Sequence, residues 1–309
     1  MRVLVTGGAG FIGSHLVDAL ADRGDQVVVL DDLSTGDRGR LPAAIRFVEG
    51  SLADPDTVAG AVDGAEVVFH LGALGAVARS VDDPLASDTA NVRGTLVVLD
   101  ASRAAGVGRV VFASSSSVYG GADVVPTPED APLRPRSPYA VTKLTGEHYC
   151  RVFTELHGLE TVALRFFNVY GPRQSPDSTY AAVIPLFCRA VLAGEHPTVH
   201  GDGGQSRDFT FIADVVDALF AAAVAPAKRC SGRPYNIAAG RSTSLLELLR
   251  LLGGLTGTHP TPVHTDPRAG DVYRSEADPS AARRDLGFEC RTSVRDGLAA
   301  TLASLREPS

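Results

Sequence analysis

The amino-acid sequence predicts an α/β protein in which a doubly wound parallel sheet carries a smaller α/β lobe. Through the first half of the chain, short runs rich in Val, Ile and Phe alternate with helical patterns. This alternation is typical of parallel strands that are covered by helices on both faces. After about residue 168 the rhythm changes, and loops rich in Pro, Gly and Arg separate shorter helices. Such loops on a rigid scaffold favour a lobe that binds a ligand.

The buried strands are expected at residues 2–6, 26–30, 45–48, 66–70, 109–114 and 161–167. The helices are expected at residues 11–23, 84–105 and 138–157, followed by shorter ones within 181–194, 212–224 and 242–255. The helix at 138–157 has the clearest start, because Ser137 is a preferred N-cap residue and Pro138 suits the first helical position. We predict a division into a sheet domain, residues 1–167 plus about 209–238, and a lobe, residues 168–208 plus 239–309.

Composition and charge exclude several kinds of function. The formal net charge of −7 argues against general nucleic-acid binding, which requires a basic surface. No apolar run reaches membrane-spanning length, and the N-terminus leads into a strand and a glycine turn rather than a signal peptide. The eight histidines show no metal-ligand spacing. The cysteines stand far apart, which favours free thiols in a reducing cytoplasm: Cys150, Cys188, Cys230 and Cys290. We expect a soluble cytoplasmic protein without a metal site.

A glycine turn follows the first strand. Gly7, Gly10 and Gly13 have the spacing G-x-x-G-x-x-G between that strand and the first helix. Glycine lets the backbone approach a pyrophosphate, which the free N–H groups of the helix N-terminus bind. Because glycines mark any tight turn, it is the strand–turn–helix context that favours a dinucleotide. The second strand ends at Asp31, whose carboxylate would bind the ribose hydroxyls of NAD and repel the extra phosphate of NADP.

Tyr139 and Lys143 lie one turn apart on the same face of the helix at 138–157. Taken alone, the pair could be ordinary surface residues. Together with the glycine turn, it resembles the Tyr-x-x-x-Lys signature of the extended short-chain dehydrogenase/reductase superfamily, whose sheet domain is a Rossmann fold. The resemblance implies that Tyr139 is the general base. Its pKa must then fall by about three units, roughly 4 kcal/mol. The ammonium of Lys143 and the positive nicotinamide ring would stabilise the phenolate.

The superfamily also uses a Ser or Thr after the fifth strand to hydrogen-bond the reacting oxygen. The segment "FASSSSVYGG" places that role on Ser115. Dehydratases of the superfamily carry one or two acidic residues directly after this position, where the chain has Ser116 and Ser117. Hydroxyl groups titrate far above neutral pH and cannot replace carboxylates as acid and base, so dehydration is disfavoured.

Over nearly the whole chain the resemblance is closest to the NDP-sugar epimerases of the UDP-glucose 4-epimerase type. The similar segments are "HLGALGAVARSVDDP", "NVRGTLVVLDA", "LRFFNVYGPRQ", "GDGGQSRDFTFIADVVDA" and "DPRAGD". Besides the glycine turn and Asp31, the resemblance implies NAD contacts from Phe11, Ile12, Ser51, Leu52, Leu71, Ala73, Asn91, Tyr139 and Lys143. It implies UDP-sugar contacts from Ser115, Tyr139, Asn168, Val183, Arg207, Arg268, Asp271 and Ser275. Two arginines suit a diphosphate because guanidinium groups form charge-assisted, often bidentate hydrogen bonds.

Three positions depart from the family pattern. Ser51 stands where relatives usually have an aspartate that contacts the adenine, and Gly75 stands where some have a lysine. Both departures are expected to loosen the retention of NAD. Ser275 stands where some epimerases restricted to UDP-glucose have a tyrosine. The smaller side chain leaves room for a 2-N-acetyl group, so UDP-N-acetylhexosamine substrates stay open.

We therefore expect NAD-dependent inversion at C4 of a UDP-hexose through a transient 4-keto sugar, with no net redox change. A UDP-glucuronate 4-epimerase or another NDP-sugar oxidoreductase is the alternative among enzymes. A non-catalytic dinucleotide-sensing protein is the alternative of a different class, although it should have lost the Tyr/Lys pair. The resemblance also suggests a homodimer in which the helices at 84–105 and 138–157 pair across the interface. The alternative is that their apolar residues are buried in the core of the single chain.

Overall fold

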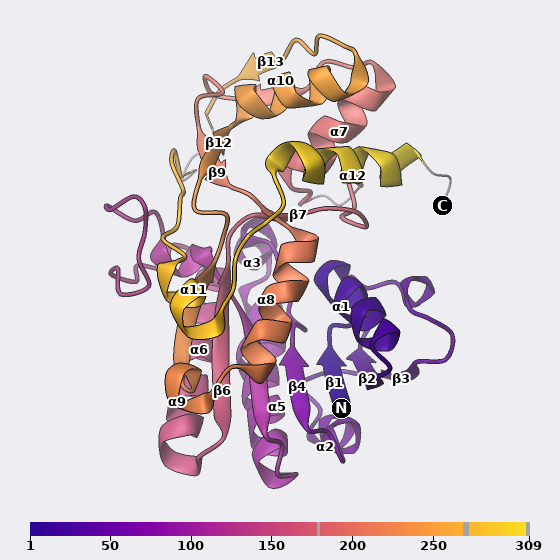
Figure 1. Ribbon diagram of the computed structural model, residues 1–309, viewed down its shortest axis with the longest axis vertical. Coiled ribbons are helices and arrows are strands. Elements are labelled where there is room, and N and C mark those ends of the chain that lie inside the picture. Colours follow the sequence, from indigo (N-terminus) through magenta and orange to yellow (C-terminus); the bar gives the residue numbers. More distant parts are fainter. Residues whose placement is uncertain (178–179, 268–271, 307–309) are drawn as a thin grey trace.

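The computed structural model describes residues 1–177, 180–267 and 272–306. A seven-stranded parallel sheet occupies its lower part, in the order β11-β6-β5-β4-β1-β2-β3 (Figure 1). Its strands are β1 (Arg2–Thr6), β2 (Gln26–Asp31), β3 (Arg46–Glu49), β4 (Val67–His70), β5 (Arg109–Ser115), β6 (Glu160–Phe166) and β11 (Arg233–Ile237). The chain winds outward from β1 in both directions, and ligands of such sheets bind beyond the strand ends at this switch point. The predicted doubly wound parallel sheet is confirmed.

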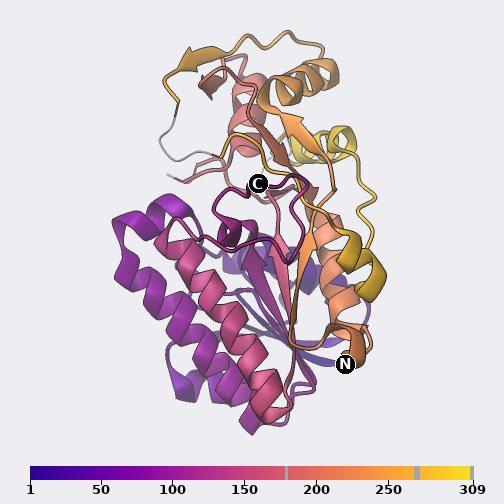
Figure 2. The same cartoon turned by 90° about the vertical axis from the view of Figure 1, so that its left-hand side faces the viewer.

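Helices cover both faces of the sheet. One face packs against α1 (Phe11–Asp22) and α8 (Ile212–Val224), and the other against α2 (Pro55–Val62), α5 (Gly94–Ala104) and α6 (Pro138–His157). Strand residues alternate between the two cores: Val3 and Val5 of β1 belong to the first and Leu4 to the second. Figure 2 shows α5 and α6 side by side along the second face. Double-sided burial explains why the strands are recognisable as continuous apolar runs.

The predicted helical stretch at 84–105 is confirmed, but it contains a π-helical turn that was not predicted. The segment forms α4 (Pro84–Asp88), a π-helical turn (Thr89–Arg93) and α5. A π turn holds one residue more than an α turn and occurs mostly at functional sites. Here it accompanies the inward placement of Asn91, whose side chain is 2% exposed. The helix at 138–157 is confirmed with both of its bounds, and the Ser137 hydroxyl accepts the backbone N–H of Ala140 at 3.1 Å.

A third core forms the lobe at the top of Figure 1. It contains α7 (Val183–Ala193), α10 (Leu245–Thr256) and α12 (Val294–Arg306). Short strands pair around it: β8 (Thr198–His200) with β13 (Val263–Thr265), β9 (Ser206–Asp208) with β12 (Ser242–Ser244), and β7 (Val169–Tyr170) with β10 (Thr210–Phe211).

The remaining helices are α3 (Val77–Asp82), α9 (Ala227–Cys230) and α11 (Ser280–Leu286), and 3₁₀ turns occur at Arg38–Arg40 and Ser116–Tyr119. Within the residues assigned to the lobe, α11 packs against β11, α8 and α9 beside the sheet. The division of the chain into residues 1–167 plus about 209–238 and the rest therefore stays a prediction.

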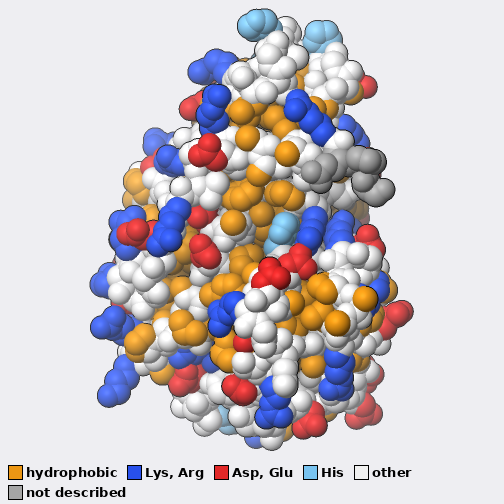
Figure 3. Space-filling view, turned by 45° about the vertical axis from the view of Figure 1, so that its right-hand side comes forward, with side chains coloured by type: hydrophobic (Ala, Val, Ile, Leu, Met, Phe, Trp, Pro, Cys, Tyr) orange, Lys and Arg blue, Asp and Glu red, His pale blue; other side chains and the backbone are white. Residues whose placement is uncertain are grey.

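The surface carries charge of both signs. On the face in Figure 3, hydrophobic side chains gather in a band down the middle, and basic and acidic side chains are interspersed around it. Charges of both signs therefore occur side by side on this face. Within the described residues, no helix combines the length and the apolar character needed to cross a bilayer.

Candidate active site

The glycine turn between β1 and α1 has no room for side chains. Gly7 has a φ of +67°, and a Cβ there would lie 2.6 Å from the Cα of Gly72. A Cβ on Gly13 would collide with the carbonyl oxygen of Gly7. Glycine is required at both positions because the two backbone segments approach each other directly. The same close approach leaves the backbone accessible to a bulky ligand.

The N-terminus of α1 is uncapped by any side chain. Gly10 is the N-cap residue and Phe11 and Ile12 form the first turn, which contains no acidic residue. The backbone N–H groups of a first helical turn have no partner within the helix, and the dipole makes this end positive. Together with the glycine turn, this end fits the pyrophosphate of a dinucleotide.

Asp31 lies beside the glycine turn at the end of β2. Its Oδ2 accepts the backbone N–H of Ala9 at 3.0 Å, and its Oδ1 accepts that of Leu33 at 2.9 Å. Burial raises the pKa of Asp31, while these two hydrogen bonds partly offset the effect. The carboxylate is thus fixed at the position where a dinucleotide fold binds the ribose hydroxyls.

The other predicted cofactor residues lie around the same strand ends. Leu71 and Ala73 follow β4, and the Leu52 side chain lies beside Gly72, where an added Cβ would approach its Cδ1 to 2.6 Å. Ser51 is exposed, and its hydroxyl accepts a backbone N–H within its own turn at 3.2 Å. The structure therefore brings Leu52 next to the glycine turn, whereas Ser51 occupies the exposed rim.

Asn91 ties the loop after β4 to α6. Its Oδ1 accepts the backbone N–H of Leu74 at 2.8 Å, and its Nδ2 donates to the carbonyl of Leu74 at 3.1 Å. The same Nδ2 donates to the hydroxyl of Thr142 at 3.0 Å, which in turn donates to the carbonyl of Tyr139 at 2.8 Å. Asn91 thus supports the backbone that carries Tyr139, and its predicted contact with NAD stays a prediction.

Tyr139, Lys143 and Ser115 meet at the carboxyl end of β5. The Ser115 hydroxyl lies close enough to the Tyr139 phenol to lower the pKa of the phenol. The Lys143 Nζ donates to the carbonyl of Ala113 at 2.8 Å and lies 5.9 Å from the centre of the Tyr139 ring. Since Ser115 is the last residue of β5 and Tyr139 lies in the first turn of α6, regular elements position both groups.

Burial dominates the electrostatics of this trio. It raises the pKa of Tyr139 above its usual value, and the hydrogen bond with Ser115 offsets this only in part. Burial also lowers the pKa of Lys143 to about 8. The expectation that the pKa of Tyr139 is lowered is therefore not met by the chain alone. The positive charge of an oxidised nicotinamide is the further influence that can favour the phenolate.

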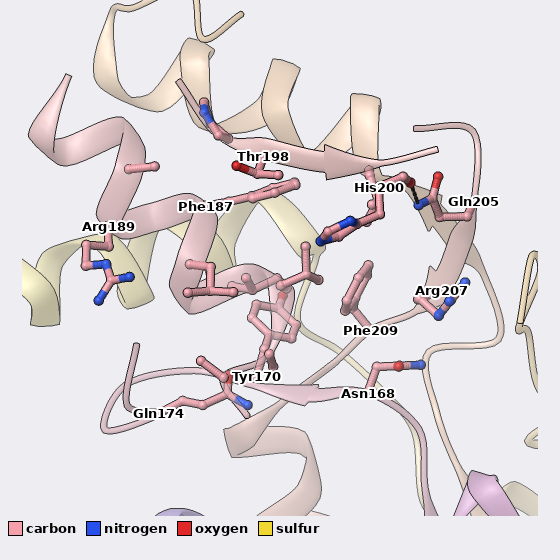
Figure 4. A pocket seen from close by; sticks show the side chains of 18 of the residues that line it. Asn168, Tyr170, Gln174, Phe187, Arg189, Thr198, His200, Gln205, Arg207 and Phe209 are labelled. Atoms are coloured by element: carbon pink, nitrogen blue, oxygen red, sulfur yellow. Dashed lines mark hydrogen bonds between the residues drawn. The ribbon is translucent and has the colours of Figure 1, made fainter. Parts of the chain in front are cut away.

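A cavity of about 500 Å³ opens in the upper lobe between α7 and the strands β7, β8 and β9. Three predicted substrate residues line it: Asn168, Val183 and Arg207. Figure 4 shows Asn168 and Arg207 at one end and Gln174 and Arg189 at the other. Because Ser115 pairs with Phe166 in the sheet, Asn168 follows the reactive edge by two residues, and the cavity begins there.

Two further predicted substrate residues, Arg268 and Asp271, lie outside the described residues. The backbone N–H of Ser275 donates to the carbonyl of Ser206 at 3.1 Å, which places Ser275 beside Arg207. The Asn168 Nδ2 donates to the carbonyl of Asp208 at 2.9 Å. These contacts gather Asn168, Arg207 and Ser275 around one strand, β9.

Sequence reasoning missed polar residues that line the cavity or support the site. The cavity is also lined by Gln174, Arg189, Thr198 and His200, and the Ser80 hydroxyl accepts the backbone N–H of Tyr139 at 3.0 Å. Gln174 lies within the segment "LRFFNVYGPRQ", which resembles a substrate-binding element of the family. Its place in that segment could have identified it as a candidate. Among the described residues, no group of His, Cys, Asp and Glu could hold a metal ion.

Comparison with known proteins shows the family to which the chain belongs. Residues 3–238 match the model of the NAD dependent epimerase/dehydratase family. The chain is 42% identical over 316 residues to a UDP-glucose 4-epimerase of Mycolicibacterium smegmatis, and the alignment covers both proteins completely.

Two solved structures extend the likeness to three dimensions. A UDP-glucose 4-epimerase of Thermotoga maritima, solved with UDP-glucose, superimposes with a TM-score of 0.94 at 38% identity over 99% of each chain. A UDP-N-acetylglucosamine 4-epimerase of Methanobrevibacter ruminantium, in complex with UDP-N-acetylmuramic acid, gives a TM-score of 0.93 at 36% identity. That alignment covers 98% of this chain and 97% of the other.

Proposed function

The chain belongs to the NAD-dependent epimerase/dehydratase family, and from this premise we propose that it inverts C4 of a UDP-hexose through a transient 4-keto sugar. The predicted family resemblance is thereby confirmed, and NAD is the cofactor of the family. One observation carries the proposal further. The Tyr139 phenol, the Ser115 hydroxyl and the buried ammonium of Lys143 lie together at the strand edge that also holds the glycine turn.

In this proposal the chain's residues bind, orient and move one proton. Gly7, Gly13 and the first turn of α1 hold the pyrophosphate, and Asp31 holds the adenosine ribose. The bound NAD would supply the acceptor and then the donor of the C4 hydride. The Tyr139 oxygen takes the proton of the sugar 4-hydroxyl and gives it back, and the Ser115 hydroxyl orients that oxygen.

Inversion also requires that the nucleotide stays bound while the keto sugar rotates to present its opposite face. The cavity in the upper lobe suits the nucleotide, because Asn168 and Arg207 supply donors next to an apolar lining that includes Val183. Arg268 and Asp271 remain proposed contacts to the phosphate and the ribose. The anchors lie in a different lobe from Tyr139, so the sugar can rotate about its diphosphate linkage without leaving the site.

UDP-glucose and UDP-galactose are the first proposed substrates, and UDP-N-acetylglucosamine and its C4 epimer are the second. The small side chain of Ser275 favours including the N-acetyl sugars. Incubation of the purified protein with UDP-glucose, UDP-N-acetylglucosamine and UDP-glucuronate, followed by NMR of the C4 epimers, tests the proposal. If none of these sugars is inverted and Tyr139→Phe changes nothing, the proposal is wrong.

The same experiment separates the alternatives. Inversion of UDP-glucuronate alone would identify a UDP-glucuronate 4-epimerase, and accumulating NADH absorbance would identify a net oxidoreductase. A 4-keto-6-deoxy product would identify a dehydratase, which the serines at positions 116 and 117 argue against. Binding of NAD without turnover of any sugar would identify a sensing protein.

We further propose that the protein is a cytoplasmic homodimer, which pairs through α3, α4 and α6. Apolar side chains are exposed on these helices: Val77 (48%), Val81 (62%), Leu85 (79%), Val141 (49%) and Leu156 (73%). An apolar face of this kind is typical of an interface between subunits. Leu85→Asp should convert the dimer into a monomer in light scattering, whereas Val224→Asp, on an exposed valine of α8, should not. A monomeric parent protein would contradict this proposal.

A further inference from the structure

A buried ion pair lies directly below the reactive residues. Glu147 of α6 and Arg165 of β6 have side chains that are 7% and 2% exposed. Arg165 Nε donates to Glu147 Oε1 at 2.9 Å, and Nη2 donates to Oε2 at 2.8 Å. Burial alone would lower the pKa of Arg165, but its hydrogen bonds with Glu147 raise it above the usual value. The pair is therefore bidentate and almost entirely shielded from solvent.

Glu147 extends the reactive face of α6 by one turn. Tyr139, Lys143 and Glu147 are spaced by four residues, so they form one stripe along the helix. Two members of this stripe bond to consecutive residues of β5. The Lys143 Nζ donates to the carbonyl of Ala113, and the Ser114 hydroxyl donates to Glu147 Oε1. Two such bonds fix both the rotation and the translation of the helix against the strand.

Ser115 directly follows these two strand residues, and the network also holds the chain beyond it. Arg165 Nη1 donates to the Tyr119 hydroxyl at 2.7 Å and to the carbonyl of Glu129 at 2.8 Å. The Tyr119 hydroxyl in turn donates to Asn236 Oδ1 at 2.7 Å. Burial raises the pKa of Tyr119 to about 12, so it remains a donor. Ser115 thus lies between two residues that the ion pair holds: Glu147 accepts the hydroxyl of Ser114, and Arg165 donates to the hydroxyl of Tyr119.

A buried pair of this kind contributes little net stability, because desolvation of both charges offsets their attraction. Its geometric effect is more direct. We propose that Glu147 and Arg165 are positioning residues that set the distance and angle between the Tyr139 phenol and the Ser115 hydroxyl. The inference rests on the proposed function, since it assigns these residues to the same proton transfer. It predicts that the pair controls turnover rather than the binding of either ligand.

The test compares two glutamates of the same helix. Glu147→Gln keeps the size of the side chain but removes the charge that holds Arg165. It should lower kcat about 100-fold, as expected when a reacting group is displaced by about 1 Å. The KM for the UDP-sugar and the Kd for NAD should change by less than about twofold. The control is Glu155→Gln, because Glu155 is 63% exposed and its contact with Arg151 is 3.9 Å long. Its kcat should stay within about twofold of the parent.

Two further variants separate positioning from folding. Ser114→Ala removes a single hydroxyl and should lower kcat about fivefold to tenfold, the value of one hydrogen bond. The double variant Glu147→Met/Arg165→Met removes both charges and leaves no uncompensated one, so it should unfold near the temperature of the parent. Its kcat should nevertheless remain as low as that of Glu147→Gln. If Glu147→Gln does not fold, the kcat values of Ser114→Ala and of the double variant test the proposal instead.

The pH profile of kcat distinguishes positioning from a purely structural role, because a loss of stability alone would not shift it. The acidic limb of kcat, which reports the ionisation of Tyr139 in the complex, should shift to higher pH in Glu147→Gln and Ser114→Ala but not in Glu155→Gln. A double variant with the kcat of the parent, or an unshifted limb in all variants, would overturn the inference. A parent protein that inverts no UDP-sugar would contradict the proposed function instead, so the two failures are distinguishable.

Discussion

The reactive edge of the sheet and the cavity of the upper lobe are built in opposite ways. At the reactive edge, a long helix and a central strand supply the side chains, and Lys143 is buried and bonded to the carbonyl of Ala113. Around the cavity, short strands, α7 and their connections supply the side chains. Asn168 adopts a left-handed φ of +33°, and the ion pair of Arg189 with Asp177 is exposed. The groups proposed to react lie on a long helix and a central strand, whereas the groups proposed to recognise the nucleotide lie on short strands and their connections, where binding residues are common.

The largest effect should come from the reactive edge. Tyr139→Phe removes the proposed proton acceptor, so kcat should fall about 10²- to 10⁴-fold, the contribution typical of a general base. Because Tyr139 lies outside the cavity lining, the KM for the UDP-sugar should change little. Initial rates of epimer formation at several substrate concentrations measure both constants. A variant with most of its activity would contradict the role of Tyr139.

A substitution in the cavity should change KM rather than kcat. Arg207→Ala removes a guanidinium from the cavity, and the KM should rise about tenfold or more, as for the loss of one charged hydrogen bond. The kcat should stay near that of the parent. Arg189→Ala is the control and should have a smaller effect, since Arg189 lies at the other end of the cavity and its side chain is half exposed. A fall in kcat at constant KM would place Arg207 in the reactive centre instead.

The pH dependence should report the buried lysine. Burial penalises the ammonium and lowers the pKa of Lys143 to about 8, so the charged form is lost as the pH rises through that value. If the ammonium is needed, kcat/KM should fall about tenfold for each pH unit above about 8, because this ratio follows the free enzyme. Lys143→Met should remove this basic limb from its residual activity. A flat profile up to pH 10 in the parent would contradict the prediction.

The smallest effect should appear at the rim of the cavity. Ser275→Tyr should lower kcat/KM for UDP-N-acetylglucosamine about tenfold and leave UDP-glucose nearly unchanged, because the larger ring would fill the space for the N-acetyl group. Ser275→Ala, which adds no bulk, should keep the ratio between the two substrates. Competition between the two sugars in one reaction gives this ratio directly. An equal loss for both sugars would show that Ser275 does not select the substrate.

The sequence was most informative where local chemistry determines the structure. The bounds of α6 agree with the prediction because Ser137 and Pro138 mark its start and a left-handed glycine, Gly158, marks its end. Six strands of the main sheet agree, mostly because burial on both faces leaves continuous apolar runs. The seventh, β11, was not predicted, because its sequence RPYNI is not a continuous apolar run. The glycine turn was equally readable, since steric exclusion at Gly7 and Gly13 allows one residue type only.

The features that sequence reasoning missed depend on distant partners. The π turn accompanies bonds between Asn91 and two segments that lie far from it in the chain. Glu147 looks like a surface residue of a helix until Arg165 is placed opposite it. The strands of two or three residues around the cavity are too short to show a period. In each case the missing information is which residues meet after folding.

Strand β11 lies at the edge of the sheet next to β6, although the chain builds half of the upper lobe between them. During synthesis, β6 therefore exposes unpaired backbone groups until residue 237 has left the ribosome. A fragment that stops near residue 168 keeps this open edge and is prone to aggregate. The sheet is complete only after the chain has passed through part of the upper lobe, so we expect the first 168 residues to fold poorly when they are produced alone.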